Sequence, residues 1–250
     1  MNISGKVALI TGSAKRIGRF TAIELAKRGA RVAIHYRNSE EEAKETLRLI
    51  QSEGGTAALF QADLSDLSSI EELFQKLDQH FGMLDILVNS ASTFHTSSAV
   101  ETSGELWEEQ MNSNARAPFF VAQAAARMMM RQAREGHQGN QAKIINIVDV
   151  AGEVIWPGYF AYSVSKAALI AVNRGLAKAF APAIQVNGIA PGPVLFPDHY
   201  TEEQKHSAVE RTLLKRAGQP SDIVNAVVFL IENDYITGEI IHVDGGRHIM

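Results

Sequence analysis

Tyr162 and Lys166 are the residues of this chain best suited to proton-transfer chemistry. They are four positions apart in the run Tyr-Ser-Val-Ser-Lys, so a helix through this segment places both side chains on one face. An ammonium close to a phenol favours the phenolate, and we expect Lys166 to hold the pKa of Tyr162 below its usual value of about 10. Such a tyrosine can donate or accept a proton near neutral pH. Because this spacing also occurs by chance on surface helices, its meaning depends on a nucleotide-binding segment elsewhere.

A glycine-containing turn at residues 11–18 is the candidate phosphate-binding segment. Gly12 permits a tight turn after the first apolar run, and Gly18 lets the following helix approach the sheet closely. The free N–H groups at the start of that helix can bind a pyrophosphate. The turn departs from the G-x-G-x-x-G pattern, and Arg16 stands where a related pattern has glycine. An ordinary strand–helix turn is the alternative, but a position in the first βα unit favours cofactor binding.

The end of the second expected strand predicts which dinucleotide is bound. An NAD site usually has an acidic residue here that holds the ribose hydroxyls, whereas residues 35–39 of this chain contain no acid. Arg37, Ser39 and Arg16 could surround a 2′-phosphate, which suits the planar donor fork of arginine. The alternative is a solvated basic turn. We therefore predict NADPH as the cofactor.

The pattern of apolar runs and helical segments predicts an α/β fold. A helix is expected at 19–28, and Ser39 can cap the helix that follows it. Short buried strands that alternate with helices indicate a single-domain, doubly wound (Rossmann) parallel sheet flanked by helices on both faces. The expected strands are 7–11, 31–36, 56–61, 84–89, 143–149, 184–190 and 239–243.

The composition restricts the classes of function. The chain has 250 residues and a net charge of −4, so no excess of basic charge suggests nucleic acid or an anionic membrane as a partner. It has no cysteine, which excludes a disulfide, a thiolate metal site and a cysteine nucleophile. No metal site is expected. The N-terminal residues do not resemble a signal peptide, and no apolar run predicts a membrane span, so we expect a cytoplasmic protein with a small-molecule substrate.

Taken together, these motifs resemble the short-chain dehydrogenase/reductase family over nearly the whole chain. The motifs are the turn at 11–18, Asp63-Leu64, the segment 89–92, Asn114, Tyr162 with Lys166, Pro191-Gly192 and Thr237-Gly238. The resemblance implies that Tyr162 donates a proton, that Lys166 binds the nicotinamide ribose, and that Asn114 holds a water that relays protons. The predicted cofactor-binding residues are Gly12, Ser13, Lys15, Arg16, Ile17, Gly18, His35, Tyr36, Arg37, Asn38, Ser39, Asp63, Leu64, Asn89, Ser90, Ala91, Tyr162, Lys166, Pro191 and Gly192.

Two departures from the family pattern point to a subgroup. Asp149 stands where the family usually has a catalytic serine, and residues 89–92 read Asn-Ser-Ala-Ser instead of Asn-Asn-Ala-Gly. An ionised aspartate only accepts hydrogen bonds, which suits a substrate that presents N–H groups. Both departures resemble pteridine reductases, and the C-terminal residues 244–250 resemble bacterial dihydromonapterin reductases. In that subgroup the pterin lies between the nicotinamide and a phenylalanine, here Phe94. The predicted substrate-binding residues are Arg16, Ser92, Phe94, Asp149 and Tyr162.

The sequence therefore predicts an NADPH-dependent reductase that converts a dihydropterin or dihydrofolate to its tetrahydro form. A general carbonyl or 3-oxoacyl-thioester reductase of the same fold is the alternative, and a catalytically idle NADPH-binding sensor is a third possibility. We expect residues 193–211 to form a mobile substrate loop. His199 in this loop could touch the substrate, but a solvated loop histidine is the favoured interpretation. Members of the family usually form tetramers through helices near 115–135 and 160–180, so a homotetramer is expected.

Overall fold

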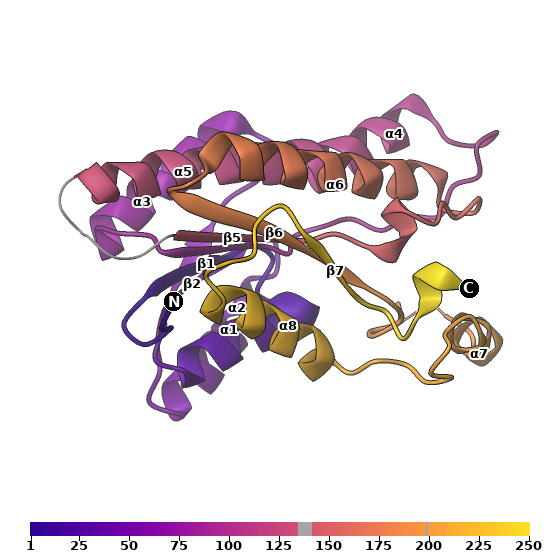
Figure 1. The fold of residues 1–250 in the computed structure, drawn as a ribbon, viewed down its shortest axis with the longest axis horizontal. Coiled ribbons are helices and arrows are strands. Elements are labelled where there is room, and N and C mark those ends of the chain that lie inside the picture. The colour runs from indigo at the N-terminus through magenta and orange to yellow at the C-terminus, as the bar shows by residue number, and fades with distance from the viewer. Residues whose placement is uncertain (135–141, 199) are drawn as a thin grey trace.

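The computed structural model describes residues 1–134, 142–198 and 200–250 of the chain (Figure 1). In these residues, seven parallel strands form one sheet in the order β3-β2-β1-β4-β5-β6-β7. The strands are β1 (Val7–Ile10), β2 (Arg31–Tyr36), β3 (Thr56–Gln61), β4 (Ile86–Asn89), β5 (Ala142–Ile147), β6 (Ile184–Pro191) and β7 (Ile240–Val243). The strand order reverses between β1 and β4, which creates the crevice where open α/β sheets bind ligands.

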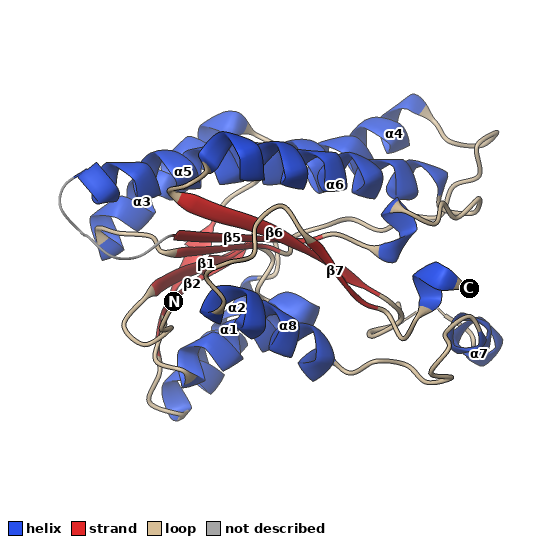
Figure 2. Ribbon diagram, viewed as in Figure 1, coloured by secondary structure: helices blue, strands red, loops and turns tan. Residues whose placement is uncertain are grey.

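Helices cover both faces of the sheet (Figure 2). One face carries α3 (Leu67–Phe81), α5 (Ala117–Arg134) and α6 (Phe160–Phe180), and the other carries α1 (Arg16–Lys27), α2 (Glu40–Ser52) and α8 (Pro220–Glu232). The remaining elements are α4 (Gly104–Met111), η1 (Asn112–Arg116), η2 (Val150–Gly152), α7 (Glu202–Glu210) and η3 (Arg247–Ile249). The prediction of a single α/β domain with a doubly wound parallel sheet is confirmed.

In the described residues, the sheet and its two helical layers enclose two large apolar cores and one smaller apolar cluster. The residues of β1 and β6 are all buried, and β1 accordingly reads as a continuous apolar run, whereas β6 also buries the polar side chains of Gln185 and Asn187. Met128 and Met129 of α5 lie in one of these cores. No helix in the described part of the chain is both long and apolar enough to cross a bilayer. Residues 136–140 are polar and contain two glycines, which predicts a surface loop, and they lie outside the described residues.

Several boundaries differ from the predicted ones for local reasons. The strand expected at 143–149 ends at Ile147, and Asp149 instead caps η2 by accepting a hydrogen bond from the Ala151 N–H at 2.8 Å. The helix expected at 19–28 begins three residues earlier, at Arg16. Ser39 occupies the N-cap position of α2, but its side chain makes no capping hydrogen bond. The expected substrate loop at 193–211 contains a helix, α7.

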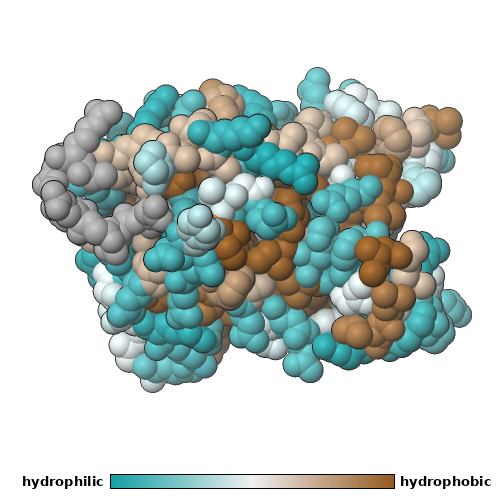
Figure 3. Space-filling model, in the orientation of Figure 1, coloured by the Kyte–Doolittle hydropathy of each residue, from teal (hydrophilic) through white to brown (hydrophobic). Residues whose placement is uncertain are grey.

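Apolar side chains are exposed at the end of the molecule that carries α7 and the C-terminus (Figure 3). Leu213, Leu214, Ile249 and Met250 are all more than half exposed. Exposed apolar patches of this kind mark surfaces where proteins associate. The homotetramer through α5 and α6 remains a prediction.

Candidate active site

A cavity of about 1380 Å³ opens at the carboxyl edge of the sheet, where β1, β4, β5 and β6 end. The following predicted site residues line it: Gly12, Lys15, Arg16, Ile17, Gly18, His35, Arg37, Asp63, Leu64, Asn89, Ser90, Ala91, Ser92, Phe94, Asp149, Tyr162, Lys166, Pro191 and Gly192. Five predicted residues are not among those that line it: Ser13, Tyr36, Asn38, Ser39 and Asn114. The sequence thus predicted residues that lie together in the wall of one cavity, and their roles remain predictions.

The turn after β1 forms a close-packed cradle at the start of α1. A Cβ on Gly12 would lie 2.9 Å from the Ala91 Cα, and one on Gly18 would lie 2.5 Å from the Gly12 carbonyl oxygen. Glycine is therefore required at both positions, and the backbone N–H groups can come close to a ligand. Ser13 is fully buried, and its hydroxyl donates to the Ile10 carbonyl oxygen at 2.8 Å. Its contribution is to the shape of the turn and not to the cavity wall.

His35 supports this turn from beneath. Its Nδ1 accepts a hydrogen bond from the Gly12 N–H at 3.1 Å, so the ring proton must be on Nε2, which donates to the Ala62 carbonyl oxygen at 3.1 Å. Burial lowers the pKa of His35 to about 4. The ring is therefore neutral at physiological pH. Tyr36, the next residue, is buried in the core.

The region expected to bind the 2′-phosphate is only partly assembled. Arg37 lines the cavity, and its guanidinium lies 4.0 Å from the Asp63 carboxylate. The Asp63 pKa is lowered mainly by hydrogen bonds from Ser65, so Asp63 carries its charge. Ser39 does not line the cavity, so its expected place beside Arg37 and Arg16 is not seen.

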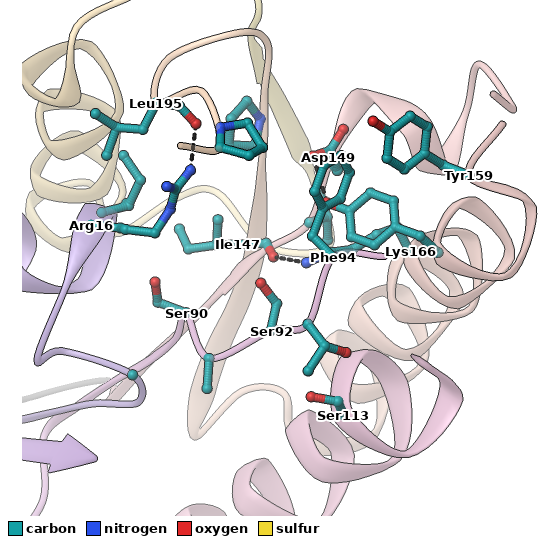
Figure 4. Close-up of a pocket in the computed structure, with 18 of the residues that line it drawn as sticks. Arg16, Ser90, Ser92, Phe94, Ser113, Ile147, Asp149, Tyr159, Lys166 and Leu195 are labelled. Carbon is teal, nitrogen blue, oxygen red and sulfur yellow. Dashed lines mark hydrogen bonds between the residues drawn. The ribbon is translucent and has the colours of Figure 1, made fainter. Parts of the chain in front are cut away.

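Arg16 connects the phosphate-binding turn to the segment after β6. Its backbone φ of +53° lies in the left-handed region, which explains why a related pattern has glycine here. Its guanidinium donates to the carbonyl oxygens of Leu195 and Phe196, the latter at 3.5 Å (Figure 4). The sequence could not predict these two acceptors, because every residue type has a backbone carbonyl.

The residues predicted to transfer protons meet at the far side of the cavity. The Tyr162 hydroxyl donates to Asp149 Oδ2 at 2.7 Å. Lys166, one turn along α6, donates from Nζ to the Ile147 carbonyl oxygen at 3.0 Å. Figure 4 shows Asp149, Phe94 and Lys166 gathered on this side, opposite Arg16. The predicted association of Asp149, Tyr162 and Lys166 is therefore present.

The expected lowering of the Tyr162 pKa is wrong. Burial raises the pKa of Tyr162 well above its usual value, and the adjacent Asp149 carboxyl raises it further. The Lys166 ammonium is more distant, 5.7 Å from the centre of the Tyr162 ring. Burial also raises the pKa of Asp149 and lowers that of Lys166 to about 8. Tyr162 therefore retains its proton at neutral pH.

Asn114 lies behind the cavity wall, in the π-helical turn η1. Its Oδ1 accepts from the Thr93 N–H at 2.9 Å, and its Nδ2 donates to the Thr93 carbonyl oxygen and to Ser165 Oγ, each at 3.0 Å. This amide fixes the segment that carries Phe94 and ties it to α6. The π-helical turn is the kind of irregularity often found at functional sites. The water relay expected at Asn114 remains a prediction.

An aromatic wall borders the proton-transfer residues. The ring of Phe94 stacks on Tyr159, with centroids 4.5 Å apart, and meets the edge of Tyr162 at 4.7 Å. The Tyr159 hydroxyl lies 2.6 Å from the Tyr200 hydroxyl, and Trp156 packs edge-on against Tyr159. Sequence reasoning found Phe94 and placed Tyr200 in the expected substrate loop, but it missed Tyr159 and Trp156. Tyr159 could have been predicted at this wall, because it lies one helical turn before Tyr162. His199 lies outside the described residues.

Comparison with known proteins assigns this chain to a protein family. Residues 12–248 match a protein family described as enoyl-(acyl carrier protein) reductase. A 3-oxoacyl-[acyl-carrier-protein] reductase of Staphylococcus aureus is 33% identical over 249 residues, covering 98% of each chain.

Two solved structures with bound NADP have the same fold. The FolM alternative dihydrofolate reductase 1 of Brucella canis is 31% identical, with a TM-score of 0.90, covering 100% of this chain and 96% of its own. The angucycline C-6 ketoreductase LanV is 30% identical, with a TM-score of 0.90, covering 100% of this chain and 98% of its own.

Proposed function

Since this chain belongs to the short-chain dehydrogenase/reductase family, we propose that it uses NADPH to reduce a pterin ring. The substrate is a dihydropterin or a dihydrofolate, and the product is its tetrahydro form. The observation that carries this proposal is the carboxyl group of Asp149 in the cavity wall, 2.7 Å from the hydroxyl of Tyr162.

The cofactor side of the cavity fits a phosphorylated dinucleotide. The cradle at Gly12 and Gly18 has no room for a side chain, so N–H groups at the start of α1 can meet a pyrophosphate. Residues 37–39, directly after β2, include Arg37 and no acid, which suits a 2′-phosphate better than free ribose hydroxyls. Asp63 and Leu64 line the part of the wall proposed for the adenine. NADPH supplies the hydride when it is bound.

The substrate side fits a flat ring that carries N–H groups. A carboxylate oxygen accepts hydrogen bonds, and Asp149 keeps acceptor capacity beyond its bonds to Tyr162 and Ala151. Phe94 offers an aromatic face at the same wall, and rings of this kind gain from stacking. A serine in place of Asp149 would donate to a carbonyl oxygen instead.

Tyr162 is the proposed proton donor to the ring nitrogen beside the reduced carbon. Its raised pKa keeps the phenol protonated, as a donor must be. Asp149 accepts the hydrogen bond of this phenol at 2.7 Å, which orients the hydroxyl at the cavity wall. Lys166 lies on the same face of α6, where its ammonium can bind the nicotinamide ribose and stabilise the phenolate.

A second candidate function follows from the relatives. The chain resembles a 3-oxoacyl-[acyl-carrier-protein] reductase at 33% identity, and Tyr162 with Lys166 would serve such a reaction equally well. In that case the substrate would be a ketone or a 3-oxoacyl thioester. Asp149 would then be a tolerated replacement without a part in substrate choice.

NADPH oxidation with four substrates separates the two candidates. We expect turnover with dihydrobiopterin and dihydrofolate and little with acetoacetyl thioester or a simple ketone. In Asp149→Ser, kcat/KM for the pterins should fall about 10²-fold, the size of a lost charged hydrogen bond at the substrate. Asp149→Asn is the matched control, because it keeps the shape and removes the charge. Unchanged pterin turnover in Asp149→Ser would make Asp149 incidental, and activity on the thioester alone would select the second candidate.

A further inference from the structure

Arg247 brings a guanidinium to the cavity wall from the C-terminal turn η3. Its Nη1 donates to the Ala208 carbonyl oxygen at 3.3 Å, and its Cζ lies 4.5 Å above the ring of Trp156. Asp244 holds the turn in place, because its carboxylate accepts from the N–H groups of Gly246 and His248 at 2.9 and 2.8 Å. The position of Arg247 is therefore fixed by the fold and not by a flexible tail.

The charge of Arg247 is partly buried and has no ion-pair partner among residues 1–134, 142–198 and 200–250. Burial lowers its pKa, and Asp149 attracts it only at longer range. Arg211, at the end of α7, lines the same cavity and repels Arg247. Two guanidiniums therefore face the cavity, from η3 and from the end of α7, and an anion between them would offset their repulsion.

The walls between Tyr162 and Arg247 are aromatic. Contacts run from Phe94 to Tyr159 at 4.5 Å, from Tyr159 to Trp156 at 6.0 Å, and from Trp156 to Arg247 at 4.5 Å. A substrate whose ring reacts beside Tyr162 can therefore lay an apolar or aromatic tail along this wall. The tail would end at the two arginines.

We propose that Arg247 and Arg211 bind an anionic group at the tail of the substrate, which makes a carboxylate-bearing folate a better substrate than a pterin with a neutral polyol tail. This inference rests on the proposed function for the identity of the reacting ring. Arginine presents a planar fork of N–H donors that matches a carboxylate with two parallel hydrogen bonds. A phosphate would satisfy the same chemistry.

Kinetics on two substrates test the inference. For the parent protein and Arg247→Met, kcat/KM is measured with dihydrofolate and with dihydrobiopterin, and the ratio of the two values is compared. We expect Arg247→Met to lower this ratio about 10- to 100-fold through KM for dihydrofolate, the effect of one lost hydrogen bond to a charged group. Arg247→Lys should lower the ratio less than Arg247→Met does, because lysine keeps the positive charge but lacks the planar pair of N–H donors.

Arg216→Met is the matched control. Arg216 lies in the same C-terminal third, pairs with Asp222 at 3.5 Å and is not among the residues that line the cavity. Its substitution should leave the ratio at the parent value. A ratio within twofold of the parent in both Arg247→Met and Arg211→Met overturns the inference.

The failure of the proposed function gives a different result. If the protein reduces neither pterin but does reduce a 3-oxoacyl thioester, the proposed function fails and the anion site is tested separately. The ratio is then taken between acetoacetyl-CoA, which carries phosphates, and the neutral N-acetylcysteamine thioester. A fall in this ratio in Arg247→Met supports an anion site for phosphate, and an unchanged ratio overturns the anion site altogether.

Discussion

Protonation of His35 should destabilise the fold and the phosphate-binding turn together. In the neutral ring, Nδ1 accepts from the Gly12 N–H and Nε2 donates to the Ala62 carbonyl oxygen. A proton on Nδ1 would place two N–H groups against each other in a buried site. Burial lowers the pKa of His35 from 6.5 to about 4, and the conflict with the Gly12 N–H opposes protonation in the same direction.

The size of the effect follows from this shift. The unfolded chain takes up a proton at His35 below about pH 6.5, whereas the folded chain does so only near pH 4. The unfolded state therefore binds more protons in this range, and stability must fall as the pH is lowered through it. The full shift of 6.5 − 4 = 2.5 corresponds to about 3 kcal/mol, and about 1.5 kcal/mol of it is lost between pH 6.5 and pH 5.

Urea unfolding at several pH values measures this loss. The fluorescence of the two tryptophans reports unfolding, and the comparison is between the parent and His35→Asn. The variant should be less stable at pH 7, but its free energy of unfolding should fall by about 1.5 kcal/mol less between pH 6.5 and pH 5. His206→Asn, exposed on α7, is the control and should keep the parent slope. Equal slopes in His35→Asn and the parent would refute the reasoning.

Two further predictions concern the proton donor and the glycine cradle. Tyr162→Phe should lower kcat about 10²- to 10⁴-fold and leave NADP⁺ affinity nearly unchanged, since it removes only the hydroxyl; full activity in steady-state kinetics would contradict the assigned role. Gly18→Ala should weaken NADP⁺ binding in calorimetry and lower the Tm, because its Cβ would lie 2.5 Å from the Gly12 carbonyl oxygen. Gly104→Ala, with nothing within 4 Å of the added Cβ, should change neither, and equal effects of the two substitutions would exclude the cradle as the cause.

The parallel sheet could be predicted from the sequence because a strand that is buried on both faces is a run of apolar residues. Such a run is visible in the sequence without knowledge of the strands that pair with it. The cofactor side was predictable for a related reason, since turns after successive parallel strands meet at one edge. Arg247 was missed although β7 pairs with β6 and ends at that same edge. Its contact with Trp156 joins residues far apart in the chain, and no periodicity reports such a contact.

The wrong expectation for Tyr162 has a more general cause. Spacing along a helix shows which side chains share a face, but it does not show which of them is nearer to a given atom. Lys166 shares a helix face with Tyr162, but its Nζ donates to the Ile147 carbonyl oxygen. Asp149 lies outside α6 and accepts a hydrogen bond from the Tyr162 hydroxyl directly. The dominant effects on the phenol are then burial and a neighbouring carboxyl, which both favour the protonated form.

The close contact also changes what a pH profile of this protein can mean. Asp149 and Tyr162 share one hydrogen bond in a buried site, so the loss of a proton from either raises the cost of losing the second. Their protons leave in steps that belong to the pair and not to either residue. Asp149→Asn removes one member while it keeps the shape, so the step that disappears from the kcat/KM profile identifies the pair. A serine at this position would give Tyr162 a neutral neighbour, and Tyr162 would then titrate in a single step. The carboxyl group of Asp149 is therefore the chemical feature that distinguishes this site.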